Sequence, residues 1–266
     1  MAAEGISTQT DNEPEDDKRM ELSEHLAELR SRIIRSILYA IAGSIAGYFL
    51  FQRIYNLLYT PMARALGDAH VEFKIAFGHF MEPFFVVLQI SIVAGLILVS
   101  PLVILEMWGF IRPALTRRER RPLRWIVPLS VTLFIMGVLL AYWIAQFAMS
   151  FFLEFVPLFP KAVLYQGPKT YVLFMLKLMG IFGLVFQMPV VLMFLAWAGL
   201  LTSASMKRSW RHAVVAIAFM GLMITPSNDA FTMLMMIVPV FALYLGSIGL
   251  VRIIERKKES RTDAKH

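Results

Sequence analysis

Residues 84–105 read FFVVLQISIVAGLILVSPLVIL, a run of 22 residues without a charged side chain. At 1.5 Å per residue, a helix of this length reaches roughly 33 Å, about the thickness of the hydrocarbon core of a bilayer. The run therefore predicts a helix that crosses a membrane.

Comparable apolar runs recur along the chain and are separated by short clusters of charge. Of the 266 residues, 58% are apolar and 17% are charged, which lies outside the composition of ordinary soluble domains. The fold class predicted is an all-α integral membrane protein with six transmembrane helices. Their approximate bounds are 33–51, 84–105, 125–149, 171–201, 209–225 and 231–251.

Two of these runs have unusual lengths. The run 171–201 is too long for one straight crossing and too short for two with a turn, so we expect a single long helix kinked at Pro189. The run 209–225 covers only about 25 Å, which is less than the hydrocarbon core.

Prolines and small residues predict how the spans are shaped and packed. Besides Pro189, three prolines fall inside predicted spans, namely Pro101, Pro128 and Pro239. Four proline-kinked helices favour a curved, concave wall of helices, although proline is also simply commoner in membrane helices than in soluble ones. The first span contains Gly43 and Gly47 within a run of small residues, which predicts close packing against another helix.

Basic residues divide unequally between the two sides that the six spans define. Nineteen Lys and Arg lie on the side that includes both termini, and five lie on the opposite side. Because positive residues collect on the cytoplasmic side, both termini are predicted to be cytoplasmic. The net charge of +7 is explained in this way, and no nucleic-acid motif accompanies it.

The composition at the two ends predicts three regions. Residues 1–23 are rich in Asp and Glu and lack the basic start and apolar stretch of a secretory signal, so we expect a disordered acidic cytoplasmic tail. Residues 24–252 form the six-span membrane domain, and residues 253–266 form a basic cytoplasmic tail. The chain has no cysteine, which excludes disulfides, thiol catalysis and thiolate metal sites.

Two cytoplasmic segments carry the most specific patterns. Residues 25–32 read HLAELRSR, and residues 113–121 read PALTRRERR. Both resemble the TatC family of the twin-arginine translocase, whose patterns are His-Leu-x-Glu-Leu-Arg-x-Arg and an aromatic-rich Trp-x-Phe-x-x-Pro-x-Leu-x-x-x-Glu-Arg. The residues that match the second pattern and the Ser-Pro before it are Ser100, Pro101, Trp108, Phe110, Pro113, Leu115, Glu119 and Arg120.

The resemblance, which covers about residues 24–252, implies a function. It implies the receptor and core subunit of the twin-arginine export system, which binds the arginine pair in the signal peptides of folded cargo at its cytoplasmic face. Transport would be driven by the proton gradient, without enzymatic activity, cofactor or metal. The implied partners are TatA- and TatB-type single-span subunits, other copies of the chain and the lipid of a bacterial-type inner membrane.

The residues themselves support an arginine-binding role. A guanidinium stays charged at every cellular pH and is matched best by a carboxylate, which Glu28 and Glu119 supply. Neighbouring side chains of an extended peptide point to opposite sides, so two arginines are met most naturally by acceptors on two elements. The alternative is that Glu28 forms an ordinary exposed pair with Arg32 at i, i+4 spacing, worth about 0.2 to 0.5 kcal/mol. The rest of the candidate signal-peptide site consists of Arg30, Phe110, Leu115 and Arg120.

Polar residues within the predicted spans form a second set of candidates. Gln187 lies near the middle of the fourth span, where an unpaired amide is costly, and it replaces a glutamate that the family usually carries. Glu106 stands where the family commonly has glutamine, and we expect it to offset that change in part. Pro101 and Asp229 are candidates for contact with partner subunits, although Asp229 is equally explained by turn chemistry.

A competing class is a secondary transporter or channel for a small solute or protons. In that interpretation Glu106, Lys177, Gln187 and Asp229 line the path. Its weakness is the absence of detectable internal repeats.

Overall fold

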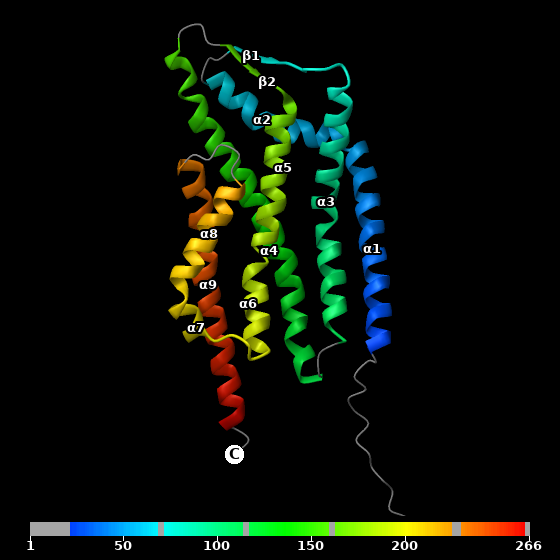
Figure 1. The fold of residues 1–266 in the computed structure, drawn as a ribbon, viewed down its shortest axis with the longest axis vertical. Helices are drawn as coiled ribbons and strands as arrows, with labels where there is room; N and C mark the ends of the chain where they lie inside the picture. The colour runs from blue at the N-terminus through cyan, green and yellow to red at the C-terminus, as the bar shows by residue number, and fades with distance from the viewer. Residues whose placement is uncertain (1–21, 69–71, 114–116, 160–162, 225–229, 264–266) are drawn as a thin grey trace, which may run out of the picture.

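The computed structural model describes residues 22–68, 72–113, 117–159, 163–224 and 230–263. Most of these residues are helical (Figure 1). The elements are α1 (Leu22–Phe49), α2 (Phe51–Asp68), β1 (Glu72–Ile75), α3 (Glu82–Ile111), α4 (Arg117–Leu153), a 3-10 turn (Val156–Leu158), β2 (Val163–Gln166), α5 (Pro168–Val185), α6 (Met188–Trp197), α7 (Ser203–Arg208), α8 (Trp210–Ile224) and α9 (Ala230–Asp263).

Helix length and composition confirm an all-helical membrane protein. Within the described part of the chain, four apolar stretches are long enough to cross a bilayer, in α3, in α4, across α5 and α6, and in α9. α1 and α2 pass the same test only together and are bent by 71° at their junction. α8 is apolar but has 15 residues, which reach roughly 22 Å. The count of six crossings therefore stays a prediction, because it depends on α1 and on this short helix.

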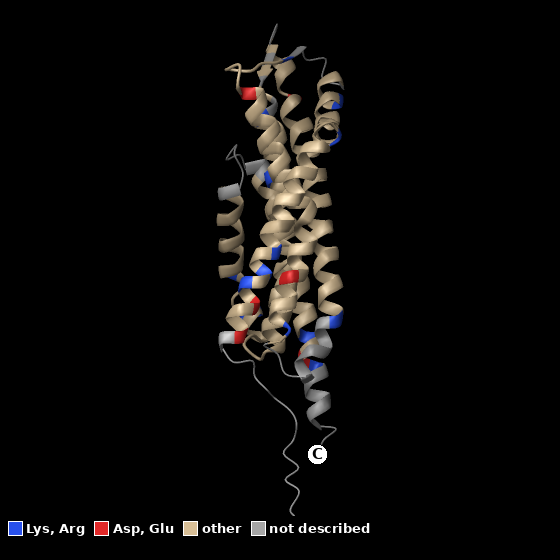
Figure 2. Cartoon of the chain, turned by 90° about the vertical axis from the view of Figure 1, so that its right-hand side faces the viewer, with Lys and Arg blue, Asp and Glu red and all other residues tan. Residues whose placement is uncertain are grey.

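The helices stand side by side in a wall that is broad in one view and narrow in the other (Figures 1 and 2). α1 and α3 form one edge of the wall, and α8 and α9 form the opposite edge (Figure 1). Charged residues lie mainly toward the two ends of the molecule, with a charge-poor band of helices between them (Figure 2).

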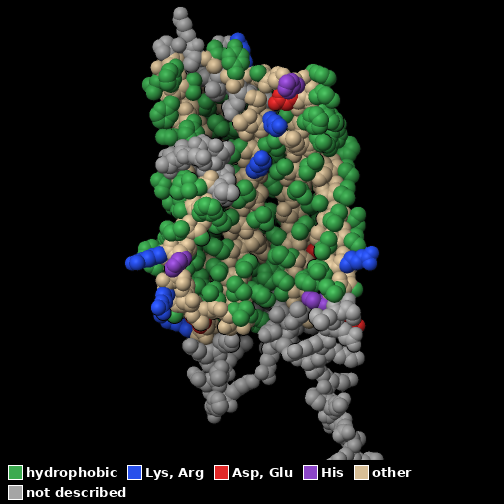
Figure 3. All heavy atoms as spheres, viewed as in Figure 1, with side chains coloured by type: hydrophobic (Ala, Val, Ile, Leu, Met, Phe, Trp, Pro, Cys, Tyr) green, Lys and Arg blue, Asp and Glu red, His purple; other side chains and the backbone are tan. Residues whose placement is uncertain are grey.

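Apolar side chains cover most of the visible face of the wall (Figure 3). Large apolar residues are more than half exposed along several helices, for example Ile37 at 53%, Val215 at 69% and Val238 at 63%. A water-soluble protein rarely leaves so much apolar surface uncovered. This surface is suited to contact with lipid tails or with other membrane helices.

The predicted close packing of the first span is confirmed. Gly43 and Gly47 of α1 face Gly95 of α3, and a Cβ built on any of the three would overlap backbone atoms of the opposite helix. The absence of side chains at these positions lets the two backbones approach. α1 is thereby held along α3, which brings the first turns of α1 close to the last turns of α3.

The predicted long helix of 171–201 is present and is interrupted where a proline requires it. α5 ends at Val185, and α6 begins at Met188 with Pro189 in its first turn. Pro189 has no N–H to donate to Val185, so the regular ladder stops there and resumes when Val191 N–H donates to the Gln187 carbonyl, 3.0 Å away. In contrast, Pro101 lies inside the continuous helix α3 and Pro239 inside α9.

Two features at the end of the molecule farthest from the C-terminus were not predicted (Figure 1). Helix α2 buries Leu58, Met62 and Leu66, which follow one another at i, i+4 spacing. Strands β1 and β2 form a parallel pair with Glu72 opposite Val163 and Ile75 opposite Gln166. Two four-residue strands far apart in sequence give no local signal of their pairing.

The predicted domain boundaries stay a prediction. α1 begins at Leu22, within the predicted acidic tail of residues 1–23, and residues 1–21 of that tail lie outside the described residues. α9 continues to Asp263, so much of the predicted basic tail is a helical extension of the last span.

Candidate functional site

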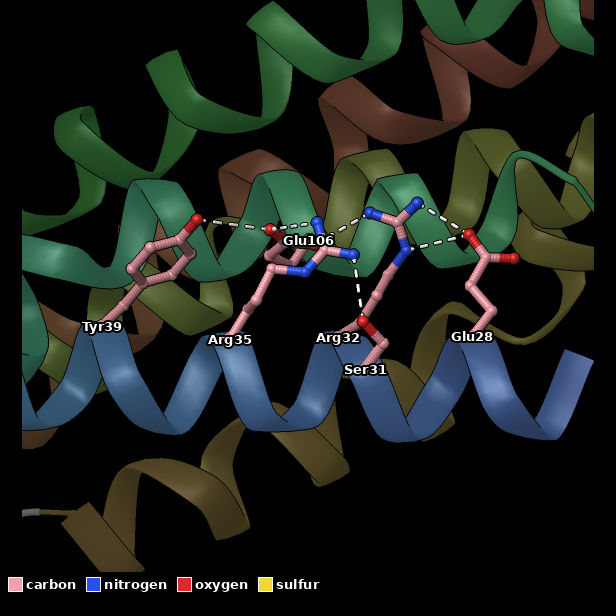
Figure 4. A network of polar contacts seen from close by, with 6 residues as sticks. All are labelled: Glu28, Ser31, Arg32, Arg35, Tyr39 and Glu106. Atoms are coloured by element: carbon pink, nitrogen blue, oxygen red, sulfur yellow. Dashed lines mark hydrogen bonds and ion pairs between the residues drawn. The ribbon is translucent and has the colours of Figure 1, made fainter.

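Three charged residues of α1 lie on one face of the helix, because Glu28, Arg32 and Arg35 are spaced by four and three residues. Opposite them on α3 lies Glu106, which is buried (Figure 4). The Arg32 guanidinium lies between the two carboxylates. Its Nε and Nη2 donate to Glu28 Oε1 over 3.1 and 2.7 Å, and its Nη1 donates to Glu106 Oε2 over 2.8 Å.

The second oxygen of Glu106 has partners of its own. Arg35 Nη1 and the Tyr39 hydroxyl both donate to Glu106 Oε1, each over 3.4 Å (Figure 4). Arg35 also donates to Ser31 Oγ over 3.3 Å. Glu106 is thus satisfied on both oxygens, and its negative charge is balanced by two arginines of α1.

Glu28 differs from Glu106 in this respect. Both Arg32 bonds go to Oε1, and the buried Oε2 has no hydrogen-bond partner among the described residues. A buried carboxylate oxygen without a donor is costly, because it has lost water and gained nothing in return. Among the described residues, the acceptor capacity of Glu28 Oε2 is therefore unused.

Gly109 of α3 provides the space in which the Arg32 guanidinium lies. A Cβ built at Gly109 would overlap Nη1 and Cζ of Arg32. The guanidinium thus lies directly against the α3 backbone. Sequence reasoning missed this glycine, because nothing in its local sequence separates it from the other glycines of the spans.

Phe110 extends the site toward the start of α1. Its ring stacks on that of His25, with centroids 4.3 Å apart and planes 15° from parallel. Separately, an exposed face of α1 alone lines an open surface depression of about 600 Å³. The lining residues are Leu26, Ala27, Arg30, Ser31, Ile34 and Arg35. Arg30 is two residues from both Glu28 and Arg32, so helix geometry places it on a different face from that pair.

Four predicted site residues are not placed by the structure. Leu115 and Asp229 lie outside the described residues, and the side chains of Glu119 and Arg120 in the first turn of α4 lie outside them as well. The expected pairing of Glu28 with Glu119 around one ligand stays a prediction.

Gln187 lies at the break between α5 and α6 and is buried. Its Oε1 accepts a hydrogen bond from Ser130 Oγ of α4, and its Nε2 donates to the Ser130 carbonyl over 3.0 Å. Ser130 Oγ in turn accepts from Trp108 Nε1 of α3 over 3.1 Å. Gln187 thus joins three helices through neutral hydrogen bonds.

Gln187 and Glu106 belong to separate groups of contacts. Glu106 bonds to side chains of α1, whereas Gln187 bonds to α4 and to its own helix. The signal for the Glu106 group was present in the sequence, since Arg35 is a basic residue inside an apolar span and such a residue requires a partner. Pro101 is half-buried in α3, and nothing in the described residues assigns it a contact with another protein.

The chemistry available at this site is the binding of cations. Within the described residues, no three His, Asp or Glu side chains are grouped so that they could hold a metal ion. The α1 and α3 site offers carboxylates, two arginines and the stacked rings of His25 and Phe110, and a carboxylate is the group that matches a guanidinium best.

Comparison with known proteins gives one consistent family. Residues 24–239 match the model of "Sec-independent protein translocase protein (TatC)". A TatC of Aquifex aeolicus is 34% identical over 90% of this chain and 98% of its own length, and one of Xylanimonas cellulosilytica is 31% identical over 92% and 88%. A crystal structure titled "Twin Arginine Translocase Receptor- TatC" superposes with a TM-score of 0.75 at 32% identity, over 87% of this chain and 99% of that one.

Proposed function

The chain belongs to the Sec-independent protein translocase (TatC) family, and from this premise we propose that it is the receptor for arginine-pair signal peptides. The peptide binds at the cytoplasmic face, and binding starts the assembly of a translocation complex. The observation that carries the proposal is Oε2 of Glu28, which has no hydrogen-bond partner among the described residues. Glu28 lies near the start of α1 and beside the end of α3 that leads into the basic 113–121 segment.

Each arginine of the pair meets one carboxylate. The first guanidinium binds Glu28, and the second binds Glu119, in the first turn of the next helix after α3. Both contacts are charge-assisted, and a planar guanidinium matches a carboxylate better than an ammonium does. Phe110 and Leu115 contact the apolar part of the signal, and Arg30 and Arg120 complete the proposed binding site.

The remaining parts of the proposal concern the membrane. Six crossings with both termini in the cytoplasm place Glu28 and Glu119 on the side from which cargo arrives. Single-span TatA- and TatB-type proteins and further copies of the chain complete the assembly in the inner membrane, and the proton gradient drives transport. Pro101 and Asp229 are the proposed contacts with these partners.

The test is the binding of a fluorescent signal peptide to the full-length protein in detergent. The peptide carries Arg-Arg or, for comparison, Lys-Lys. Loss of a hydrogen bond to a charged group costs about 1.5 to 3 kcal/mol, so Glu28→Gln and Glu119→Gln should each weaken Arg-Arg binding roughly 10- to 100-fold.

Glu154→Gln is the matched control, because Glu154 is an exposed glutamate that directly follows the far end of α4. It should leave binding unchanged. The proposal fails if both Glu28→Gln and Glu119→Gln bind the Arg-Arg peptide as tightly as the wild type does.

A further inference from the structure

Arg32 already binds, through Oε1, the same carboxylate of Glu28 that an incoming arginine would bind. Two of its N–H groups donate to Glu28 Oε1 (Figure 4). We propose that Arg32 is an internal competitor of the signal's arginine, and that Glu106 sets the strength of this competition by holding Arg32 from the other side. The inference rests on the proposed receptor function and adds a specificity mechanism to it.

The first support is the division of the Arg32 guanidinium between two carboxylates. One edge, through Nε and Nη2, is bound to Glu28, and the remaining nitrogen Nη1 is bound to Glu106 at 2.8 Å. If the signal's arginine takes Glu28, Arg32 keeps its bond to Glu106. The exchange therefore leaves no buried charge unpaired, which would otherwise cost several kcal/mol.

The second support is the shape of the site. The Arg32 side chain is 22% exposed, and Gly109 leaves room for its guanidinium against α3. Glu28 and Glu106 are 18% and 11% exposed. This pair is more shielded from water than an ordinary surface pair, so competition for Glu28 has a measurable effect on affinity.

The third support concerns the choice between arginine and lysine. A ligand that displaces Arg32 from Glu28 has to replace two N–H bonds that come from one planar edge. A guanidinium presents the same pair of donors, whereas an ammonium is a point charge without that edge. Competition by Arg32 thus raises the preference for arginine over lysine.

The experiment measures the Kd of Arg-Arg and Lys-Lys peptides for full-length variants in detergent. Arg32→Gln frees Glu28 and should tighten Arg-Arg binding about three- to tenfold, while tightening Lys-Lys binding more. Glu106→Gln removes the negative charge that holds Arg32 from the other side, so Arg32 should bind Glu28 more strongly. Arg-Arg binding should then weaken by a similar factor. Arg32→Lys, the variant with the smaller structural change, should tighten binding less than Arg32→Gln does.

Arg35→Gln is the matched control. It removes the same charge from the same helix face and the same carboxylate, but Arg35 has no bond to Glu28 in the described structure. If Arg32→Gln and Arg35→Gln tighten binding equally, net charge alone acts and the competitor role is wrong. If Arg32→Gln and Arg32→Lys weaken binding as Glu28→Gln does, Arg32 orients Glu28 instead. A wild type without preference for Arg-Arg over Lys-Lys would overturn the receptor function itself.

Discussion

The hydrogen bonds between Gln187 and Ser130 are predicted to hold the α5 and α6 break against α4. Gln187→Leu removes the acceptor of the Ser130 hydroxyl and the donor to the Ser130 carbonyl, at a site where Gln187 is only 8% exposed. Ser130→Ala removes two hydrogen bonds and leaves two buried side-chain groups, Gln187 Oε1 and Trp108 Nε1, without their observed partner.

The magnitude follows from these contacts. Leaving a buried polar group unsatisfied costs about 1 to 3 kcal/mol, and interhelical hydrogen bonds in membranes have coupling energies of roughly 0.6 to 1.7 kcal/mol. We expect Gln187→Leu to destabilise by about 1 to 2 kcal/mol and Ser130→Ala by slightly more. The double variant should be more stable than the sum of the two single effects predicts, by about 1 kcal/mol.

The assay is a double-mutant cycle on detergent-solubilised protein, followed by unfolding in increasing denaturing detergent. The matched control is Thr132→Val on the same helix, because Thr132 Oγ1 donates only to the Pro128 carbonyl of its own helix, over 2.9 Å. It should change stability by less than about 0.5 kcal/mol. Effects of Gln187→Leu and Ser130→Ala that simply add would refute a direct bond between the two residues. Arg-Arg peptide binding should be unaffected in all four variants.

Two further predictions concern helix packing. Gly95→Val places a side chain where the Gly43 backbone lies, so it should destabilise the protein by about 1 to 3 kcal/mol and lower the melting temperature. Gly246→Ala is its control, because a Cβ at Gly246 meets only open space. Equal melting temperatures for the two variants would contradict the close packing of α1 against α3. Glu255 of α9 accepts hydrogen bonds from Ser203 N, over 2.8 Å, and from Ser203 Oγ at the start of α7. Glu255→Gln should weaken this charge-assisted contact and speed amide hydrogen exchange in α7, whereas unchanged exchange would show that α7 is held elsewhere.

The sequence predicted the features that neighbouring residues determine, and it did not predict which distant segments pack together. Apolar run length predicted α3, α4, α5 with α6, and α9, because a helix satisfies its own backbone hydrogen bonds and has to cover the hydrocarbon core. Gly43 and Gly47 predicted a packing face, but the sequence did not say that α3 is the partner. Helix α2 had a local signal in its i, i+4 apolar residues, and the predicted spans simply passed over it.

The candidate site divides in the same way. The motif around Glu28 and the departures at Glu106 and Gln187 were readable from the sequence, because each is a residue type at a position. That Glu106 bonds to Arg32 and Arg35, and Gln187 to Ser130, was not readable. Helix neighbours across a wall are set by packing over separations of more than fifty residues, for which the local sequence contains no register.

The sequence by itself determined that this chain is a helical membrane protein with a charged motif before its first span, since hydrophobic length and charge clusters are local properties of the sequence. Only the tertiary structure decided which oxygens of Glu28 and Glu106 accept hydrogen bonds from Arg32. The approach of α1 to α3 brings Arg32 between Glu28 and Glu106, and Gly109 gives its guanidinium room. Glu28 Oε2 has no hydrogen-bond partner in the described part of the chain, because both bonds from Arg32 go to the other oxygen.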